Sequence, residues 1–303
     1  MSALDDLIAR AGARVVAHAN LGERTTYRVG GAAAALVTVA NGADLDELGP
    51  LIEATGLPVV ALGHGSNLLV ADGEHDVVAV QLGDGFAELS WRDVDGVVEV
   101  EAGAALDLPV AARRLASDAV VGFEWAVGVP GTFGGAVSMN AGGHGSNMAA
   151  SVVRTRTWLG QARERTLADL DFGYRTSGLE PGELVTGVTL HLARGDAAAA
   201  LEQVREIVRW RRAHQPGGAN AGSVFRNPPD DTAGRLIDAA GLKGVRVRSA
   251  VVSSKHANFI LVDRGGQAND VAQLMQLVAR RVAEQFGVEL VSEHRLIGFE
   301  GSG

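Results

Sequence analysis

The sequence contains no cysteine. Disulfide bonds, thiolate catalysis, zinc sites with cysteine ligands, iron–sulfur clusters and a flavin attached through cysteine are therefore all excluded. The eight histidines are scattered along the chain, and neither HxxxH nor HExxH spacing occurs. We therefore expect no metal site.

Long apolar segments are also missing. No apolar run approaches the roughly 18 residues of a membrane-spanning helix. Asp5 and Asp6 stand where a secretory signal would need a basic start followed by an apolar block. We therefore expect a cytoplasmic protein with no membrane partner.

A surplus of basic residues is absent as well. The chain has a net charge of -9 and an isoelectric point near 5.4, which gives no basic surface for unspecific binding to nucleic acid. We therefore expect no nucleic-acid partner. Any phosphate-bearing ligand should be small and should meet local clusters of arginine.

Proline is scarce, with 8 residues, whereas glycine is abundant, with 40. The glycines cluster between apolar runs, which indicates loops shaped around a ligand and not disorder. A chain of 303 residues, 47% of them hydrophobic, can bury a large core. This length suggests about two domains.

Strand and helix patterns alternate along the chain. Short strand-like runs extend from Val59 to Val100, and later strand patterns read VVRTRTWL, LVTGVTLHL, VRSAVVSS and ANFILVD. Helices are predicted at about 44–55, at about 108–117, after the N-cap Asp196, and from Asp270 to Phe286 with Gly287 as the C-terminal glycine. Gly49-Pro50 should break or kink the first of these helices. The change of pattern predicts a domain boundary near Gly195.

The first glycine-rich loop lies in the segment LPVVALGHGSNLLVAD, where a turn from Gly63 to Asn67 separates two apolar strands. Such a turn can direct successive backbone N–H groups into one concavity that suits a phosphate. A plain strand-to-strand turn is an equally good interpretation of this segment alone. The turn lacks the GxGxxG fingerprint and does not open a helix, so a Rossmann domain is disfavoured.

The second glycine-rich loop, VGVPGTFGGAVSMNAGGHG, has seven glycines between Gly128 and Gly145. Small residues allow a ligand to approach the backbone closely. Tight packing between elements is the alternative, although packing rarely requires so many glycines in one stretch. Two such loops in one chain suit a ligand with two phosphates.

These loops belong to a longer series of motifs. The series comprises YRVGG at 27–31, LGHGSNLLV at 62–70, the second loop at 127–145, FGYRTS at 172–177, NAGSVFRNP at 220–228, AGLKG at 240–244, HANFI at 256–260 and LVSEHRLIG at 290–298. Over nearly the whole chain, these motifs and their order resemble those of the UDP-N-acetylenolpyruvoylglucosamine reductases.

The resemblance implies an α+β fold in three parts. A two-part FAD-binding domain of the vanillyl-alcohol-oxidase-like (PCMH) type would be followed by a smaller C-terminal α/β domain that binds the substrate. The implied boundaries are 1–82 and 83–195 for the two FAD-binding parts and 196–303 for the substrate-binding domain.

The resemblance also implies a non-covalently bound FAD, with NADPH as the hydride donor. His64 lies where some relatives of this fold attach FAD through histidine, but this family holds FAD without a covalent bond. The implied cofactor-binding residues are Tyr27, then Gly63, His64, Gly65, Ser66, Asn67 and Leu68 in the first loop, and Gly128, Val129, Pro130, Gly131, Thr132, Gly134, Gly135, Asn140 and Gly142 in the second.

The family's reaction reduces UDP-N-acetylglucosamine enolpyruvate to UDP-N-acetylmuramate during peptidoglycan synthesis, which supports cell shape and division. Hydride passes from flavin N5 to C3 of the enolpyruvyl group, and negative charge develops toward the carboxylate. Ser223 matches the family's proton donor to C2. Arg175 matches a residue that can stabilise this charge, and Glu293 matches one that can share a proton or hydrogen bond with it. Outside their motifs, these residues would read as a turn hydroxyl and surface ion pairs.

For substrate binding, the resemblance implies Tyr174, Arg211, Arg212, Arg226, Asn227, Lys255 and Asn258. The family often has a lysine at the position of His214, so Arg212 or Lys255 is expected to compensate. The arginines from Arg209 to Arg212 can equally form a solvated helix end. The segment after Tyr174 has no room for the tyrosine-bearing loop of one subclass, so the chain resembles the subclass that lacks this loop.

Two other functions remain open. An FAD-dependent oxidase of the same fold would oxidise an alcohol or a sugar with O₂ and would not need NADPH. A UDP-sugar-binding regulator without activity would bind its ligand without turnover. In each case we expect a small-molecule partner and a protein that is a monomer or a weak dimer.

Overall fold

The structure is a computed structural model that describes residues 2–299. The chain forms two compact units. The first unit comprises Met1–Ala17, Ala34–Gly63 and Asp76–Arg211, and the second comprises His18–Ala33, His64–His75 and Arg212–Gly303. Helices and sheets occur in both units, which confirms the predicted α+β class.

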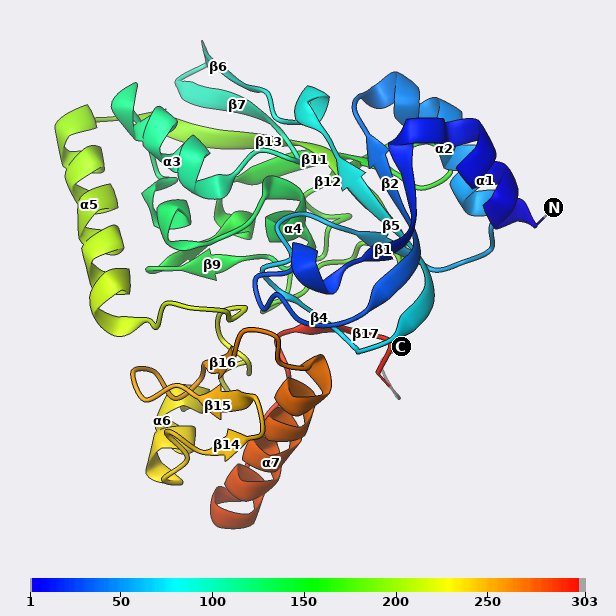
Figure 1. Cartoon of the computed structure of the whole chain (residues 1–303). Helices are drawn as coiled ribbons and strands as arrows, with labels where there is room; N and C mark the ends of the chain where they lie inside the picture. The colour runs from blue at the N-terminus through cyan, green and yellow to red at the C-terminus, as the bar shows by residue number, and fades with distance from the viewer. Residues whose placement is uncertain (1, 300–303) are drawn as a thin grey trace. The chain divides into compact units, whose positions relative to one another are not determined.

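A four-stranded sheet has the strand order β1-β2-β5-β3. Its strands are β1 (Val15–Asn20), β2 (Ala32–Val39), β3 (Val59–Ala61) and β5 (Glu74–Leu82), and β3 runs parallel to β5. Helices α1 (Ala3–Ala11) and α2 (Gly42–Ala54) lie beside one another in Figure 1. Their apolar faces share a core with the sheet, in which Leu7, Leu48 and Val80 are buried.

The predicted break at Gly49-Pro50 is wrong, because α2 continues through both residues. Leu48 and Ile52 anchor the helix in the core on either side of the proline. A Cβ at Gly49 would lie 2.0 Å from Cζ2 of Trp158, so the glycine allows the indole to pack against the helix. The apolar burial offsets the backbone hydrogen bond that proline removes.

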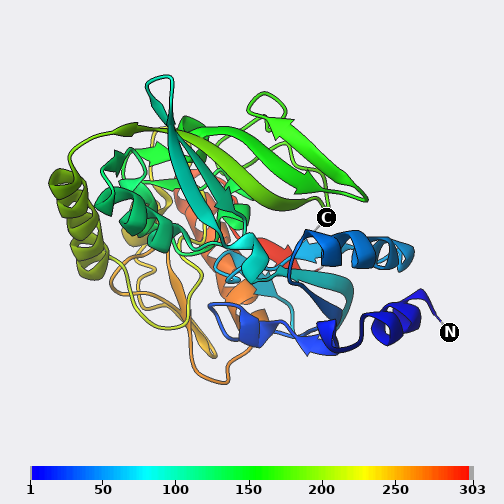
Figure 2. The same cartoon turned by 90° about the horizontal axis from the view of Figure 1, so that it is seen from above.

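The larger sheet of the first unit has six strands. Its order is β12-β11-β13-β7-β6, with β8 beside β13, and every pair is antiparallel. The strands are β6 (Leu89–Val94), β7 (Val97–Gly103), β8 (Val120–Val121), β11 (Val152–Trp158), β12 (Ala162–Thr166) and β13 (Leu184–Arg194). Figure 2 shows the long strands side by side. The strand patterns of the sequence are confirmed here, except that Phe86 belongs to a short 3-10 turn, η3 (Asp84–Phe86).

Helices cover the core of this sheet. Helix α3 (Leu108–Ser117) has the predicted bounds, and η4 (Glu124–Gly128) and α4 (Phe133–Ser138) follow it. The rings of Phe123 and Phe133 stack with centroids 5.4 Å apart in this core. Helix α5 (Ala197–His214) starts as predicted, because Oδ1 of Asp196 accepts the N–H groups of Ala198 and Ala199 at 2.7 and 3.4 Å.

The second unit contains a three-stranded antiparallel sheet, β14 (Arg246–Val247), β15 (Ala250–Val252) and β16 (Ile260–Val262). Helices α6 (Ala233–Ala239) and α7 (Ala268–Phe286) share its core, and Figure 1 shows α7 beside these strands. Helix α7 ends as predicted at Gly287, which has a φ of 67°. It begins earlier than predicted, because the carboxylate of Asp72 accepts the N–H groups of Ala268 and Asn269 at 3.1 and 3.0 Å.

Two strands that are far apart in the sequence pair in the second unit. Strand β4 (Leu68–Val70) runs parallel to β17 (Arg295–Ile297). The remaining short elements are η1 (Gly12–Arg14), η2 (Gly22–Arg24), η5 (Met148–Ala150) and the paired strands β9 (Gly142–Gly143) and β10 (Ser146–Asn147). Within residues 2–299, no helix has the length and apolar character needed to cross a membrane.

Candidate active site

The first glycine-rich loop is not the turn of a β-hairpin. The strand before it, β3, pairs with β5, whereas the strand after it, β4, pairs with β17. A hairpin turn therefore does not explain why the loop from Gly63 to Asn67 has two glycines. His64 is exposed at the outside of the loop, whereas Gly65 and Leu68 are buried.

Gly65 fixes the path of this loop. Its φ of 61° is the left-handed conformation that favours glycine, and a Cβ would lie 2.6 Å from the carbonyl oxygen of Arg24. The Gly65 carbonyl accepts the N–H of Thr26 at 3.3 Å. The hydroxyl of Thr26 is buried and has no hydrogen-bond partner among the described residues. A buried polar atom beside a glycine-rich loop fits a bound polar ligand such as a cofactor.

Gly63, the first residue of the first loop, lies next to the second loop within the first unit. A Cβ at Gly63 would lie 2.8 Å from Oγ1 of Thr132, the residue before α4. Gly131 has a φ of 124°, and its carbonyl accepts the N–H of Leu108 at 3.0 Å. The outer part of the second loop consists of the half-buried Val129 and the exposed Pro130.

The glycines of the second loop differ in what surrounds them. A Cβ would lie 2.8 Å from the His144 ring at Gly128 and 2.6 Å from Asn147 at Gly142, so both positions need glycine for packing. The N–H of Gly134 donates to the Ala104 carbonyl at 2.9 Å. Gly135, in contrast, is exposed, and the nearest atom to its Cβ position lies 4.0 Å away. Packing thus explains some of these glycines but not Gly135.

Asn140 joins the second loop to the segment that carries Arg175. Its Nδ2 donates to the Gly173 carbonyl at 2.9 Å, and its Oδ1 accepts the N–H of Ala149 at 3.0 Å. Arg175 donates from Nη2 to the Gly142 carbonyl at 2.9 Å. Its backbone has a φ of 58°, a conformation that costs free energy in a residue with a Cβ.

Tyr174 is the exposed neighbour of this arginine. Its side chain is 55% exposed, and the guanidinium carbon of Arg175 lies 5.3 Å from the centroid of the tyrosine ring. A cation above an aromatic face is weakly attracted to it. The segment therefore presents an aromatic ring and a cation together.

Ser223 lies at the end of a tight loop in the second unit. Oδ1 of Asn220 accepts the N–H of Gly222 at 3.1 Å, and Gly222 has a φ of 81°. The chain then straightens. Both backbone groups of Phe225 bond to the side chain of Asn258, through an N–H to Oδ1 contact of 2.9 Å and an Nδ2 to carbonyl contact of 2.8 Å. The amide of Asn258 thus takes the place of a neighbouring strand.

The other side of this segment pairs with the segment that contains Glu293. The N–H of Glu293 donates to the Val224 carbonyl at 2.8 Å, and the N–H of Arg226 donates to the Val291 carbonyl at 2.9 Å. Phe225 and Ser292 form the antiparallel bridge between them. Ser223 and Glu293 therefore occupy neighbouring positions on two paired segments.

Asn67 connects the first glycine-rich loop to the segment that contains Glu293. Its Nδ2 donates to the Glu293 carbonyl at 3.0 Å, and its own carbonyl accepts the N–H of Arg295 at 2.9 Å. Burial lowers the pKa of the Arg295 guanidinium. The loop that the sequence assigns to the cofactor is therefore bonded to the backbone of a predicted catalytic residue.

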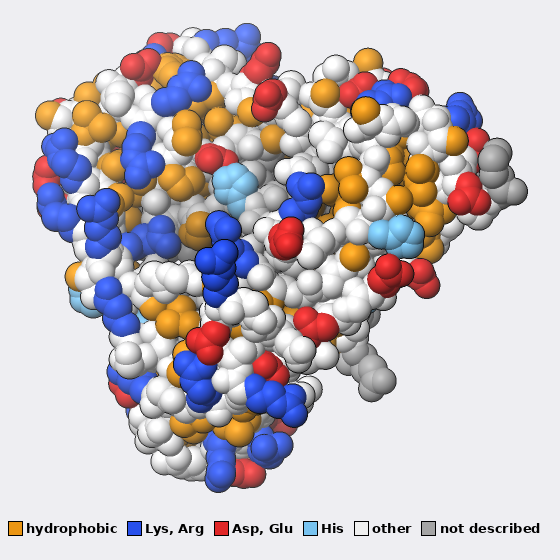
Figure 3. Space-filling view, in the orientation of Figure 1, with side chains coloured by type: hydrophobic (Ala, Val, Ile, Leu, Met, Phe, Trp, Pro, Cys, Tyr) orange, Lys and Arg blue, Asp and Glu red, His pale blue; other side chains and the backbone are white. Residues whose placement is uncertain are grey.

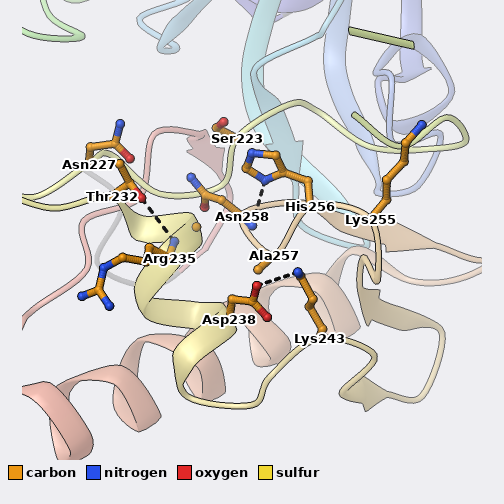
Figure 4. A pocket seen from close by; sticks show the side chains of 11 residues that line it. Ser223, Asn227, Thr232, Arg235, Asp238, Lys243, Lys255, His256, Ala257 and Asn258 are labelled. Carbon is orange, nitrogen blue, oxygen red and sulfur yellow. Dashed lines mark hydrogen bonds and ion pairs between the residues drawn. The ribbon is translucent and has the colours of Figure 1, made fainter. Parts of the chain in front are cut away.

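A polar cavity of about 360 Å³ opens beside Ser223. Figure 4 shows the side chains around it. The lining residues are Ser223, Asn227, Thr232, Gly234, Arg235, Asp238, Lys243, Lys255, His256, Ala257 and Asn258. The structure thus brings the predicted residues Ser223, Asn227, Lys255 and Asn258 to one cavity.

The charges of this cavity are partly paired. Nζ of Lys243 lies 2.6 Å from Oδ2 of Asp238, and Arg235 pairs with Asp231. Nζ of Lys255 donates to the Arg212 carbonyl at 2.5 Å and meets no carboxylate among the described residues. Figure 3 shows basic and acidic side chains next to one another in the part of the chain that holds α6 and α7. Lys255 can therefore offer its charge to an anionic ligand.

His256 is the neutral member of the cavity wall. Burial, with smaller contributions from the nearby Lys243 and His214, lowers its pKa. Its Nδ1 accepts the N–H of Asn258 at 3.3 Å, so the ring proton resides on Nε2. His256 thus presents a donor that carries no charge near neutral pH.

The other predicted substrate residues have mixed positions. Oδ1 of Asn227 accepts the N–H of Ala233, the first residue of α6, at 3.1 Å. Nε of Arg226 is buried and has no hydrogen-bond partner within residues 2–299. Burial lowers the pKa of Arg211. Arg211 and Arg212 belong to different units, and His214 is the last residue of α5.

Several residues at the site were not predicted from the sequence. Lys243 and His256 lie inside the quoted motifs AGLKG and HANFI, so their motifs could have identified them. Thr26, Arg235 and Asp238 carry no sequence signal that separates them from surface polar residues. Within residues 2–299, no group of three or more histidine, aspartate or glutamate side chains could hold a metal ion.

Comparison with known proteins defines the class first. A model of an FAD binding domain matches residues 33–167, and a model of the UDP-N-acetylenolpyruvoylglucosamine reductase C-terminal domain matches residues 214–297. The fold and the first match define the class as FAD-dependent oxidoreductase. The second match shows that the C-terminal domain is of the type found in UDP-N-acetylenolpyruvoylglucosamine reductases.

Full-length relatives then define the family. The chain is 40% identical over 282 residues to UDP-N-acetylenolpyruvoylglucosamine reductase 2 of Symbiobacterium thermophilum, covering 92% of this chain and 90% of that protein. It is 40% identical over 297 residues to the reductase of Anaeromyxobacter dehalogenans, covering 97% and 89%. The crystal structure of the reductase from Thermus caldophilus aligns with a TM-score of 0.78 at 36% identity, covering 93% of this chain and 98% of that one. The chain belongs to the UDP-N-acetylenolpyruvoylglucosamine reductase family.

Proposed function

We propose that this protein reduces UDP-N-acetylglucosamine enolpyruvate to UDP-N-acetylmuramate in peptidoglycan synthesis, with NADPH as the hydride donor and FAD as the bound carrier. The observation that carries this proposal is the placement of Ser223. It lines a cavity with cationic side chains, and its segment pairs with the segment of Glu293. The oxidase and regulator alternatives are disfavoured, because the relatives are reductases and Arg175, Ser223 and Glu293 are all present.

FAD, when bound, supplies the hydride that NADPH provides. We propose that the two glycine-rich loops hold its diphosphate, with Gly135 in the second loop and the hydroxyl of Thr26 beside the first available to it. The bond from Asn67 to the Glu293 carbonyl supports this assignment, because it links the loop to the substrate chemistry.

The chain's own residues handle the charge and the proton. We propose that Arg175 binds the substrate carboxylate and stabilises the negative charge that develops there. Ser223 donates a proton to C2, which a weakly acidic hydroxyl can do because the enolic intermediate is a strong base. Glu293 shares a hydrogen bond with the charged group.

The cavity suits the uridine diphosphate end of the substrate. Lys255 offers a cation for the diphosphate, and His256 offers an N–H donor. The side chains of Asn227 and Asn258, which also bond to the backbone, complete the polar wall. We also propose that Tyr174, Arg211, Arg212 and Arg226 contact the substrate.

We further propose that the two FAD-binding parts comprise residues 1–82 and 83–195, and that the substrate-binding domain comprises residues 196–303.

Binding of UDP to the holoprotein tests the assignment of the cavity. Replacing Lys255 by Met should raise the dissociation constant of UDP about 10-fold, because one charge-assisted contact is lost. Arg264→Met is the matched control, since Arg264 is an exposed cation of the same unit outside the cavity. If calorimetry gives equal dissociation constants for both variants, the diphosphate does not bind in this cavity.

We further propose that the protein acts in the cytoplasm as a monomer or a weak dimer. The acidic net charge and the small-molecule substrate are consistent with this. Light scattering of the holoprotein across concentrations checks the oligomeric state. A mass that stays at twice that of the chain on dilution contradicts it.

A further inference from the structure

The mechanism above leaves one buried histidine without a role. His294 follows Glu293 directly and is only 5% exposed. Its ring stands edge-on to the ring of Tyr27, with centroids 5.6 Å apart and an interplanar angle of 82°. Tyr27 is itself fully buried. An imidazole is rarely placed in such an apolar surrounding unless it makes a specific contact.

That contact is with the loop that ends at Ser223. Nε2 of His294 lies 3.2 Å from the carbonyl oxygen of Ala221. A carbonyl can only accept, so Nε2 carries the proton and donates it. Nδ1 is then the unprotonated nitrogen, and it has no hydrogen-bond partner among the described residues. The ring therefore has one polar contact, and this contact is with Ala221.

The segment of His294 holds Ser223 from both sides. On one side the imidazole bonds to Ala221, and on the other the N–H of Glu293 bonds to the Val224 carbonyl at 2.8 Å. The N–H of His294 also donates to Oγ of Ser292 at 3.1 Å, which fixes the backbone from which the ring projects. Ser223 lies between the two held residues.

Through Tyr27, His294 is connected to the first glycine-rich loop. Tyr27, against which the imidazole packs, follows Thr26, whose N–H donates to the Gly65 carbonyl at 3.3 Å. Burial lowers the pKa of His294 to about 4, so the ring stays neutral near pH 7. A neutral ring keeps the single proton that the Ala221 contact needs.

We propose that His294 is a positioning residue. Its ring packs against Tyr27 and donates to the Ala221 carbonyl, and these two contacts fix the hydroxyl of Ser223 for proton transfer. This inference rests on the proposed function, because it assigns Ser223 the proton. His294 does not touch the substrate. It acts through the loop, and a hydroxyl displaced by a fraction of an ångström transfers its proton more slowly.

The test uses the two half-reactions of the holoprotein. His294→Phe keeps the aromatic packing on Tyr27 but removes the donor, and it should slow flavin reoxidation by the enolpyruvyl substrate about 10-fold. Flavin reduction by NADPH and the dissociation constant of the substrate should change less than about 2-fold, because neither uses the hydroxyl. His294→Gln, which can donate to Ala221, should restore most of the rate. His294→Asn is too short to do so and replaces the phenylalanine variant if that variant does not fold.

A double-mutant cycle separates positioning from general damage. In a Ser223→Ala background, His294→Phe should have no further effect on reoxidation, because the hydroxyl it positions is gone. His75→Phe is the control: Nε2 of His75 contacts the Ala71 carbonyl at 2.7 Å in the same unit, away from Ser223. It should leave reoxidation unchanged.

Three results would overturn the inference. These are an equal loss in both half-reactions, a full additional loss in the Ser223→Ala background, and equal rates for the phenylalanine and glutamine variants. A wild-type protein whose reduced flavin is not reoxidised by the substrate would instead overturn the proposed function.

Discussion

Ser223 and Arg175 are held in place by different means. Ser223 belongs to a segment that pairs with the Glu293 segment on one side and with the Asn258 amide on the other. Arg175 lies in a short loop with left-handed backbone, anchored through Gly142 and Gly173. The proposed proton donor is thus fixed by strand-like pairing, whereas the arginine proposed to bind the carboxylate lies in a loop with a strained backbone.

This difference predicts how strongly a substitution at each of the two residues slows the reaction. A group that transfers a proton needs a narrow range of positions, and extended pairing provides that range. A guanidinium whose fork is displaced from a carboxylate loses its paired hydrogen bonds but keeps the attraction of its charge. We therefore expect changes at Ser223 to be more damaging than changes at Arg175.

The largest expected effect is that of Ser223→Ala. The rate of flavin reoxidation by substrate should fall by about 10³, which is within the range for loss of a general acid. Reduction of the flavin by NADPH should stay within about 2-fold, because it needs no proton from Ser223. Stopped-flow absorbance of the two half-reactions checks this. A similar loss in both would mean that Ser223 has a structural role and not a chemical one.

Acid should weaken the paired region through His294. Its folded-state pKa of about 4 lies below the usual 6.5, so the unfolded chain binds a proton that the folded protein resists. The stability is complete above pH 6.5 and falls as the pH drops, by about 3 kcal/mol at pH 4. Denaturant unfolding at pH 7 and pH 4 should show this loss in the wild type but not in His294→Phe. Parallel losses in both proteins would contradict a buried neutral imidazole.

Arg175→Lys should have an intermediate effect. Lysine keeps the charge but cannot fork onto a carboxylate, so reoxidation by substrate should slow about 100-fold. The exposed Arg281→Lys on α7 is the control, because Arg281 is 63% exposed and pairs weakly with Glu284 at 3.8 Å. If Arg175→Lys slowed the reaction more than Ser223→Ala, the proposed difference between the two parts would be wrong.

The smallest expected effect concerns Gly135. The protein leaves room for a methyl group there, so Gly135→Ala can weaken FAD binding only if the cofactor occupies that space. We expect the dissociation constant of FAD to rise about 10-fold. Gly143→Ala is the matched control, because that glycine also has open space around it and lies in the same motif. Unchanged FAD affinity in Gly135→Ala would place the diphosphate elsewhere.

The sequence allowed prediction of the long helices and of the family. The stripe of apolar residues and Gly287 marked α7, and the periodic segment at 108–117 marked α3. The family was predicted because the motifs match one family, and relatives at 40% identity confirm that assignment. The catalytic roles of Arg175, Ser223 and Glu293 stay predictions. The positions within the second loop that need glycine for packing could not be predicted, because they depend on neighbours such as His144 and Asn147.

The remaining features depend on contacts between distant segments. The pairing of β4 with β17 joins strands of three residues each, which carry no local signal for their partner. The same holds for Asp72 at the start of α7 and for the side chain of Asn258 beside Phe225. The continuation of helix α2 through Gly49-Pro50 was not predicted, because the rule for proline does not include the packing of Trp158.

One anaerobic experiment distinguishes a reductase that turns over this substrate from a protein that only binds it. NADPH is added to the purified holoprotein until the flavin absorbance is lost, and UDP-N-acetylglucosamine enolpyruvate is then added in the absence of oxygen. We expect the flavin absorbance to return and one UDP-N-acetylmuramate to form for each flavin reoxidised. A flavin that stays reduced with this substrate would contradict the proposed reaction.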